Sequence, residues 1–141
     1  MKPEQQEPKY WRYDAGDGWT VFAGKTDEDN DLLSLQFALP DDYWFHVATL
    51  PGSHVLLRAP EGFEGDAPKE KLLFAAGIAL WHSKARNAGR TPVDCTRAKF
   101  VSKPRHAKPG LVTISHETTM RAYPVSPAPT QESQNSQKKR G

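Results

Sequence analysis

The sequence has 141 residues, of which 37% are hydrophobic and 26% are charged. This length supplies the core of one compact domain and is short for two. Its single cysteine, Cys95, excludes an intramolecular disulfide and a cysteine-based zinc cage within one chain, and fits a reducing compartment. The first residues lack the apolar core of a signal peptide and no stretch reaches transmembrane length, so we expect a soluble, cytoplasmic protein with no membrane contact.

Positive charge is concentrated in one part of the chain, although the formal net charge is only +2. Residues 1–81 carry 7 basic and 14 acidic side chains, whereas residues 82–110 carry 8 basic side chains and one acidic side chain, Asp94. Such clustering attracts polyanions and is typical of phosphate binding. The alternative is an ordinary solvated, basic surface, and charge alone does not decide between the two.

The composition predicts one folded domain between two polar ends. Residues 1–9 indicate a disordered leader, and residues 10–123 the folded domain. Residues 124–141 are rich in Pro, Ser and Gln, end in basic side chains, and contain too few apolar groups to offset the entropy of ordering them. We therefore expect a disordered tail there.

The first half of the domain indicates short strands. Two aromatic segments, residues 11–13 and 19–23, flank a cluster of Gly and Asp suited to a hairpin turn. An acidic stretch follows, and residues 32–39 then fit neither the helical nor the strand period. Residues 43–47 and 54–58 are β-prone and are separated by a Pro-Gly turn, so we expect paired or neighbouring strands.

The second half indicates one principal helix at about residues 66–87, followed by further strands. Asp66 is a candidate N-cap, and apolar residues recur at helical spacing on both sides of the helix. Residues 93–101, 111–115 and 119–123 read as strands, the last two joined by a short turn. The order predicts an α+β fold, in which a small sheet of antiparallel or mixed strands packs around the helix.

Strand alternation predicts a face that could stack on unpaired bases. Trp44 and His46 share one face of their strand, and His54 and Arg58 share the corresponding face of the next. Aromatic and basic side chains on one surface are typical of single-stranded or looped RNA recognition. The alternative is that Trp44 belongs to the core and that both histidines are hydrogen-bonded within it.

Two Lys-Pro pairs, at residues 103–104 and 108–109, frame a basic loop. Proline restricts such a loop, so its cations lose less entropy on meeting phosphates. Asp94 is expected to orient a basic side chain rather than act as a general base.

Five motifs now appear in a fixed order. They are Trp44-Phe45-His46, Pro51-Gly52-Ser53-His54-Val55, Ser83-Lys84-Ala85-Arg86, Pro92-Val93-Asp94-Cys95-Thr96 and Ala107-Lys108-Pro109-Gly110. Together they resemble the NFACT-R domain, the RNA-binding domain that ends the large NFACT factors of ribosome-associated quality control and also occurs alone in bacteria. The chain departs from the family pattern at Cys95, where an aromatic residue is usual, and at His106, where glycine is usual.

The resemblance implies RNA binding, with tRNA or ribosomal RNA as ligand and the ribosome or a separate NFACT-N protein as further partners. No cofactor, metal, DNA specificity or enzymatic activity is implied, and the amino-terminal domain and coiled coil of the full-length factors are absent, so tail synthesis by this chain alone is not expected. The residues expected to bind RNA are Trp44, His46, His54, Arg58, Lys84, Arg86, Arg97, Lys99, Lys103, Arg105 and Lys108.

Three other hypotheses compete with RNA binding. A hydrolase would recruit Ser53, His54 and Asp94, but the Gly-x-Ser-x-Gly elbow is missing and adjacent strand residues point to opposite faces. A metal site would need separated residues, His46, His54, His82 and Cys95, with no compact ligand motif. A protein-interaction adaptor that docks on a ribosomal or translation factor, without direct RNA contact, is the stronger alternative.

Overall fold

The computed structural model describes residues 6–127 and 133–134, and its centre is one antiparallel sheet. The sheet has seven strands in the order β8-β5-β3-β4-β2-β1-β9. These strands are β1 (Tyr10–Gly16), β2 (Trp19–Gly24), β3 (Tyr43–Val47), β4 (Val55–Arg58), β5 (Thr91–Arg97), β8 (Thr118–Ala122) and β9 (Ser133–Gln134). Two short strands, β6 (Val101–Ser102) and β7 (Thr113–Ile114), pair separately.

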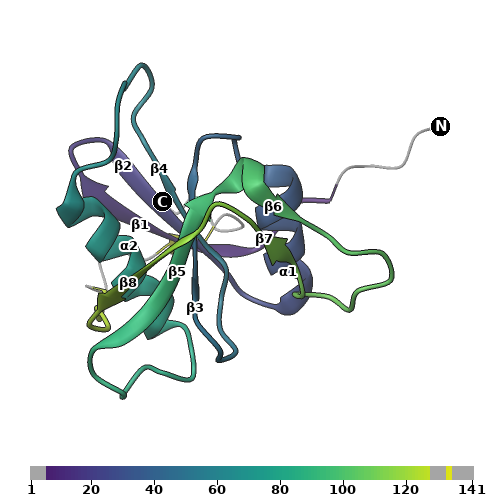
Figure 1. The fold of residues 1–141 in the computed structure, drawn as a ribbon. Coiled ribbons are helices and arrows are strands. Elements are labelled where there is room, and N and C mark those ends of the chain that lie inside the picture. Colours follow the sequence, from purple (N-terminus) through teal and green to yellow (C-terminus); the bar gives the residue numbers. More distant parts are fainter. Residues whose placement is uncertain (1–5, 128–132, 135–141) are drawn as a thin grey trace.

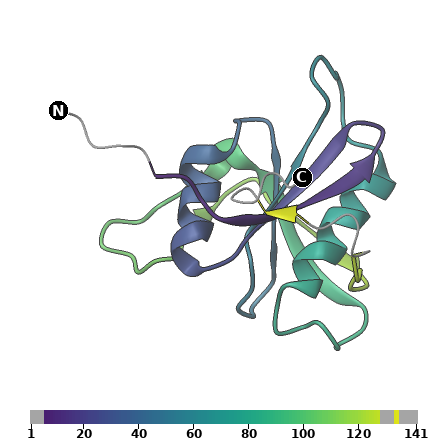
Figure 2. The same cartoon turned by 180° about the vertical axis from the view of Figure 1, so that it is seen from behind.

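Both faces of the sheet are covered. The long helix α2 (Lys69–Trp81) lies on one face, as Figures 1 and 2 show from opposite sides. The short helix α1 (Asp27–Leu32), the π-helical turn η1 (Leu33–Phe37) and the β6–β7 pair lie on the other face. A 3-10 turn, η2 (Ala98–Phe100), joins β5 to β6. The predicted α+β fold is therefore confirmed.

Strand alternation assigns side chains to two cores. Phe45 and Leu57 are fully buried in the cluster that includes α2. Trp44 and Leu56 belong to a second cluster with Leu33 of η1. Successive residues of a strand point to opposite faces, so β3 and β4 contribute alternately to both cores.

The principal helix is shorter than the predicted range of 66–87. Pro68, not Asp66, occupies the N-cap, and the Asp66 carboxylate instead lies 3.5 Å from the guanidinium of Arg97. At the other end α2 stops at Trp81 because the next residues pair with another loop, described below. Lys84 and Arg86 consequently lie beyond the last helical turn, not within it.

Two other segments differ from expectation. The ambiguous stretch 32–39 is helical, because Thr26 caps α1 by accepting a hydrogen bond from Asp29 N and the chain continues directly into η1. The strands β7 and β8 follow one another along the chain, with residues 115–117 between them, but do not pair. Instead β7 pairs with β6, and β8 pairs with β5.

Backbone hydrogen bonds also flank residues 10–123 on both sides. Lys9 N donates to the Asp29 carboxylate, and Val125 N donates to Gly77 O, which holds the segment after β8 against α2. A side chain at Gly77 would overlap Val125, so glycine permits this close contact. The rest of the predicted leader and tail, residues 1–5, 128–132 and 135–141, lies outside the described residues.

No helix in the described ranges is long and apolar enough to cross a membrane.

Candidate nucleic-acid interface

Two of the sequence motifs meet at one end of the sheet. Gly52, in the β3–β4 loop, forms an isolated antiparallel bridge with Ser83, just past the end of α2. Ser53 N donates to His82 O over 3.0 Å, and Lys84 N donates to Pro51 O over 3.1 Å. The Pro-Gly-Ser-His motif and the Ser-Lys-Ala-Arg motif therefore form one structural unit.

Glycine is required where the two motifs cross. A Cβ atom built on Gly52 would lie 2.6 Å from Ser83 Cβ, a distance that real Cβ atoms do not tolerate. The Ser83 hydroxyl is already engaged, because it donates to Leu80 O and accepts from Ala85 N. Any larger residue at position 52 would push the loops apart.

The crossing forms the floor of an open cleft of about 360 Å³. Three basic side chains border it, those of Lys25, Lys84 and Arg86. Trp11, Gly24, Pro51, Gly52, Ser53, His82 and Ser83 complete the lining. Lys84 and Arg86 follow the carboxyl end of α2, where the helix dipole favours cations.

Aromatic rings stand beside these cations. Trp11 stacks on His82 with 6.0 Å between ring centroids and 12° between ring planes. The Lys25 ammonium lies 3.8 Å from the centroid of the Trp11 ring. Arg86 is held by its Nε–H, which donates to Trp81 O, and by stacking on the Trp81 ring. Cations and flat rings thus share one small surface.

His82 is a neutral support for this surface. Its Nε2 lies 2.7 Å from the Tyr13 hydroxyl, and burial lowers its pKa to about 4, assisted by the charge of Arg86. A neutral imidazole can pack under Trp11 without bringing a buried charge.

The basic loop 103–110 is fixed beside the β3–β4 loop. Lys103 Nζ lies 3.0 Å from the Asp31 carboxylate of α1 and also donates to the carbonyls of Lys108 and Leu111. Gly110 N donates to the same carboxylate. Lys103 therefore shapes the loop, while the exposed side chains of Arg105 and Lys108 are left at its surface.

A chain of hydrogen bonds through His54 joins this loop to the sheet. His54 Nε2 must donate to Gly110 O, because a carbonyl only accepts, and its Nδ1 therefore accepts from the Ser34 hydroxyl. The Ser34 oxygen in turn accepts from the indole N–H of Trp44. The pKa of His54 falls to about 4, chiefly because burial disfavours the imidazolium and secondarily because of His46.

The base-stacking face expected from the sequence is closed in the structure. Trp44 is 3% exposed and His54 is 2% exposed, both beneath α1 and η1, so neither can stack on a base from an open sheet surface. His46 lies between them and Asp94, half-buried, with its pKa lowered mainly by burial. The alternative interpretation, a core tryptophan with hydrogen-bonded histidines, is correct for Trp44 and His54.

The expected cations do not form one patch. Arg58 forms an ion pair with buried Asp42, Arg97 bonds to the Tyr43 hydroxyl, and Lys99 lies 3.0 Å from Asp41. Arg58 and Arg97 end β4 and β5 beside Tyr43, at the end of the sheet opposite the cleft, and Lys99 follows β5 in η2. Asp94 does not orient a basic side chain in this structure; it accepts from the Thr119 hydroxyl.

The remaining cations lie along what we call the basic edge, formed by loops 48–54, 82–90 and 103–110. Figure 1 shows the first two loops at the lower end of the molecule and the third, between β6 and β7, at its right side. The Gly52–Ser83 bridge connects the first two, and the bond from His54 to Gly110 connects the first and third. Of the expected residues, Lys84, Arg86, Arg105 and Lys108 are exposed here.

Sequence reasoning missed Trp11, Lys25 and the structural role of His82. The β1–β2 hairpin could have indicated that Trp11 and Lys25 are neighbours. In that hairpin Trp11 lies opposite Ala23, which places Lys25 close to the indole. Nothing local in the sequence indicates that this hairpin would meet the end of α2.

The residues of the hydrolase hypothesis are not assembled. The Ser53 hydroxyl donates to Gly24 O, while His54 is bound to Ser34 and Gly110. Within the described part of the chain, no cluster of three His, Cys, Asp or Glu side chains could hold a metal ion.

The fold and cleft together define a small α+β module that presents aromatic and basic groups on one edge. A family model described as the NFACT protein RNA binding domain matches residues 9–116. The chain is 36% identical over 133 residues to the Rqc2 homolog RqcH of Bacillus subtilis, with 88% of this chain and 22% of that protein covered. It is 37% identical over 123 residues to the Rqc2 homolog RqcH of Streptococcus suis, with 86% of this chain and 21% of that protein covered.

A solved structure agrees with this relationship. The C-terminal part of the fibronectin/fibrinogen-binding protein from Streptococcus suis superposes with a TM-score of 0.73 at 32% identity, covering 87% of this chain and 47% of that one. The chain belongs to the NFACT protein RNA binding domain family. It spans about a fifth of the length of the curated relatives named above.

The crossing of the two motifs predicts a specific pair of variants. Gly52→Ala should destabilise the fold by about 1–3 kcal/mol, because overpacking forces the loops apart. Adding Ser83→Gly removes the opposing Cβ atom but also the two hydrogen bonds of the Ser83 hydroxyl, so it should recover only part of that loss. Urea denaturation of the single and double variants measures this, and equal stability of Gly52→Ala and the parent protein would contradict the proposed crowding.

Two neutral histidines, buried His54 and half-buried His82, predict a pH dependence of stability. In the unfolded chain they regain their ordinary pKa of 6.5, so the unfolded state binds more protons between about pH 4 and 6.5. Stability should be complete above pH 6.5 and fall on acidification, by up to about 1.4 kcal/mol per pH unit for each histidine. His54→Gln should reduce the slope measured by urea denaturation between pH 5 and 6.5, and an unchanged slope would contradict a neutral His54 in the folded protein.

Proposed function

We propose that this chain binds RNA at the basic edge, with the cleft between the β3–β4 loop and the end of α2 as its centre. The observation that carries the proposal is the meeting of two family motifs in a cleft bordered by Lys25, Lys84 and Arg86. Membership in a family described as RNA binding supports the same conclusion.

Phosphates would be bound by the exposed cations. Lys84 and Arg86 lie at the cleft, and Arg105 and Lys108 extend the positive surface along the neighbouring loop. Arg86 is already oriented by the Trp81 ring and carbonyl, which reduces the entropy lost when it meets a phosphate. The RNA backbone would follow the basic edge from one of these loops to the next.

Trp11 would supply the stacking surface that the sequence analysis assigned to Trp44. It is partly exposed, is supported from within by His82 and lines the cleft. A base stacked there would take the place of the Lys25 ammonium over the ring, and Lys25 and Lys84 would then be available for its phosphates. Unpaired RNA fits this arrangement better than a duplex, whose bases are not available for stacking.

The RNA would belong to the translation machinery. The relatives are named as homologues of Rqc2, and the family name refers to NFACT proteins, so tRNA or ribosomal RNA in ribosome-associated quality control is the proposed ligand class. The proposed role is binding without catalysis, in the cytoplasm, with the ribosome or a separate NFACT-N protein as further partner.

Salt dependence tests the phosphate contacts. Five cations, those of Lys25, Lys84, Arg86, Arg105 and Lys108, should give a slope of roughly −3.5 for log K against log salt with single-stranded RNA, at about 0.7 per contact. Lys84→Glu should weaken binding and flatten this slope. The matched control is Lys99→Glu, another exposed lysine at the opposite end, which should change neither quantity by much. Equal effects of the two variants in fluorescence anisotropy titrations would contradict the location.

Stacking on Trp11 is tested separately. Trp11→Ala should weaken binding of unpaired RNA by about 1–3 kcal/mol, the usual contribution of one base–aromatic stack, without changing the salt slope. Phe63→Ala, which removes a partly exposed ring at the far end, serves as control. Quenching of tryptophan fluorescence by bound RNA should also be reduced in Trp11→Ala, and undiminished affinity would show that Trp11 does not stack on RNA.

A further inference from the structure

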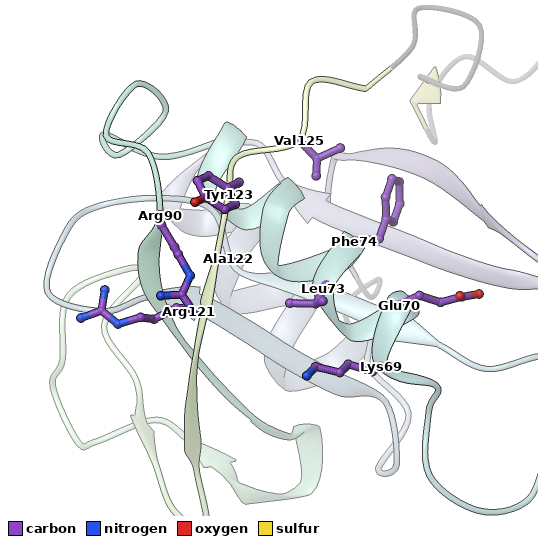
Figure 3. A pocket seen from close by; sticks show the side chains of 9 residues that line it. All are labelled: Lys69, Glu70, Leu73, Phe74, Arg90, Arg121, Ala122, Tyr123 and Val125. Atoms are coloured by element: carbon purple, nitrogen blue, oxygen red, sulfur yellow. The ribbon is translucent and has the colours of Figure 1, made fainter.

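A second cavity lies on the α2 face, away from the cleft. It has a volume of about 520 Å³ and lies between α2, β8 and the segment that follows β8 (Figure 3). Its lining consists of Lys69, Glu70, Leu73, Phe74, Arg90, Arg121, Ala122, Tyr123 and Val125. None of these residues lines the cleft of the basic edge.

The cavity combines an apolar floor with a basic rim. Leu73 and Phe74 are only partly buried, and Tyr123 is 65% exposed, the highest value among the large hydrophobic residues of the described chain. Lys69, Arg90 and Arg121 are exposed around this floor. A surface of this kind fits a ligand with large apolar groups flanked by negative charge.

The rim is positive because its one carboxylate is engaged elsewhere. Figure 3 shows Lys69 and Leu73 extending from α2 toward β8, whereas Glu70 points away from that strand. Glu70 lies 3.7 Å from the Lys71 ammonium. Among the described residues, the side chains of Lys69, Arg90 and Arg121 have no hydrogen-bond or ion-pair partner.

The cavity adjoins an open strand edge. β8 is a terminal strand of the sheet, paired with β5 on one side and with no described strand on the other. An extended peptide can pair with such an edge through its backbone while its side chains enter adjacent pockets. The edge and the cavity share Arg121 and Ala122, so one peptide could use both.

We propose that this surface binds an extended, acidic segment of a partner protein, whose large apolar side chain enters the cavity while flanking carboxylates meet the basic rim of Lys69, Arg90 and Arg121. This binding would be additional to RNA binding at the basic edge. RNA is a poorer fit, because Leu73 and Val125 make part of the floor aliphatic and because the open edge of β8 offers backbone groups that pair with a peptide. In addition, Arg121, Ala122, Tyr123 and Val125 lie beyond the residues matched by the family model, and none of the five motifs contributes to the lining.

An unbiased peptide selection tests the proposal with the intact chain. A random twelve-residue peptide library displayed on phage is selected against the full-length protein, and the enriched peptides are synthesised for titration. We expect sequences with one or two large apolar residues between Asp or Glu residues. In NMR titrations they should shift the backbone amides of Leu73, Ala122 and Tyr123.

Two charge-reversal variants distinguish this site from the RNA site. Lys69→Glu combined with Arg121→Glu should weaken the peptides by at least about tenfold and leave binding of single-stranded RNA within about twofold, because neither residue belongs to the loops of the basic edge. Lys84→Glu combined with Arg105→Glu, the matched control at the basic edge, should show the opposite pattern. All four positions are exposed, so both variants should fold.

Several outcomes would overturn the proposal. These are failure to enrich any peptide family, enrichment of sequences without acidic residues, amide shifts outside the cavity and β8, or unchanged peptide affinity in the Lys69/Arg121 variant. Loss of RNA binding in that variant would show that the cavity belongs to the RNA surface instead. RNA binding at the cleft could fail its own tests without affecting these results.

Discussion

The arrangement of the basic edge depends on the buried, neutral imidazole of His54. Its two ring nitrogens bond to Ser34 of η1 and to the Gly110 carbonyl, and Ser34 also binds the indole of Trp44. One side chain therefore connects the sheet, its second helical layer and the loop that presents Lys108. Two carboxylate contacts, from Asp31 to Lys103 and to Gly110 N, secure the same loop. A histidine that the sequence suggests as a ligand contact thus acts by positioning other groups.

The basic residues likewise divide into those that stabilise the fold and those that are exposed at the surface. Lys103 is partly buried and satisfies two carbonyls and one carboxylate, so its charge maintains the loop rather than a surface. Arg58 does the equivalent at the other end of β4, where it pairs with Asp42 and packs on the rings of Phe22 and Phe37. Buried or half-buried charges need such partners, because leaving one unpaired is costly. The exposed cations of the basic edge, which form no ion pair within the described residues, are the ones available to bind a polyanion.

The sequence was most informative where local periodicity decides the outcome. The hairpin of β1 and β2, the neighbouring strands β3 and β4, and the alternation of their side chains all follow from patterns of two residues. The elements that cover each face of the sheet cannot be predicted from this alternation. The segment 32–39 fits no clear period, and because it was not recognised as a helical cover, the face with Trp44 was expected to be open. Charge counting likewise located a basic stretch but could not show that Arg97 and Lys99 meet carboxylates from residues far away in the chain. The pairing of Trp11 with the end of α2 depends on the same long-range packing.

The two ends of the sheet differ in charge, so the molecule has a positive end and a negative end. The β1–β2 turn, whose sequence includes Asp17, and the acidic loop 59–68 lie at the end of the sheet opposite loops 48–54 and 82–90 of the basic edge (Figure 1). Such a separation of charge produces an electric dipole, which exerts a torque on the molecule in the field of a polyanion. The protein would rotate as it approaches, so that the basic edge arrives first and the acidic end faces away. Encounters would then begin in nearly the bound orientation, before any individual contact forms.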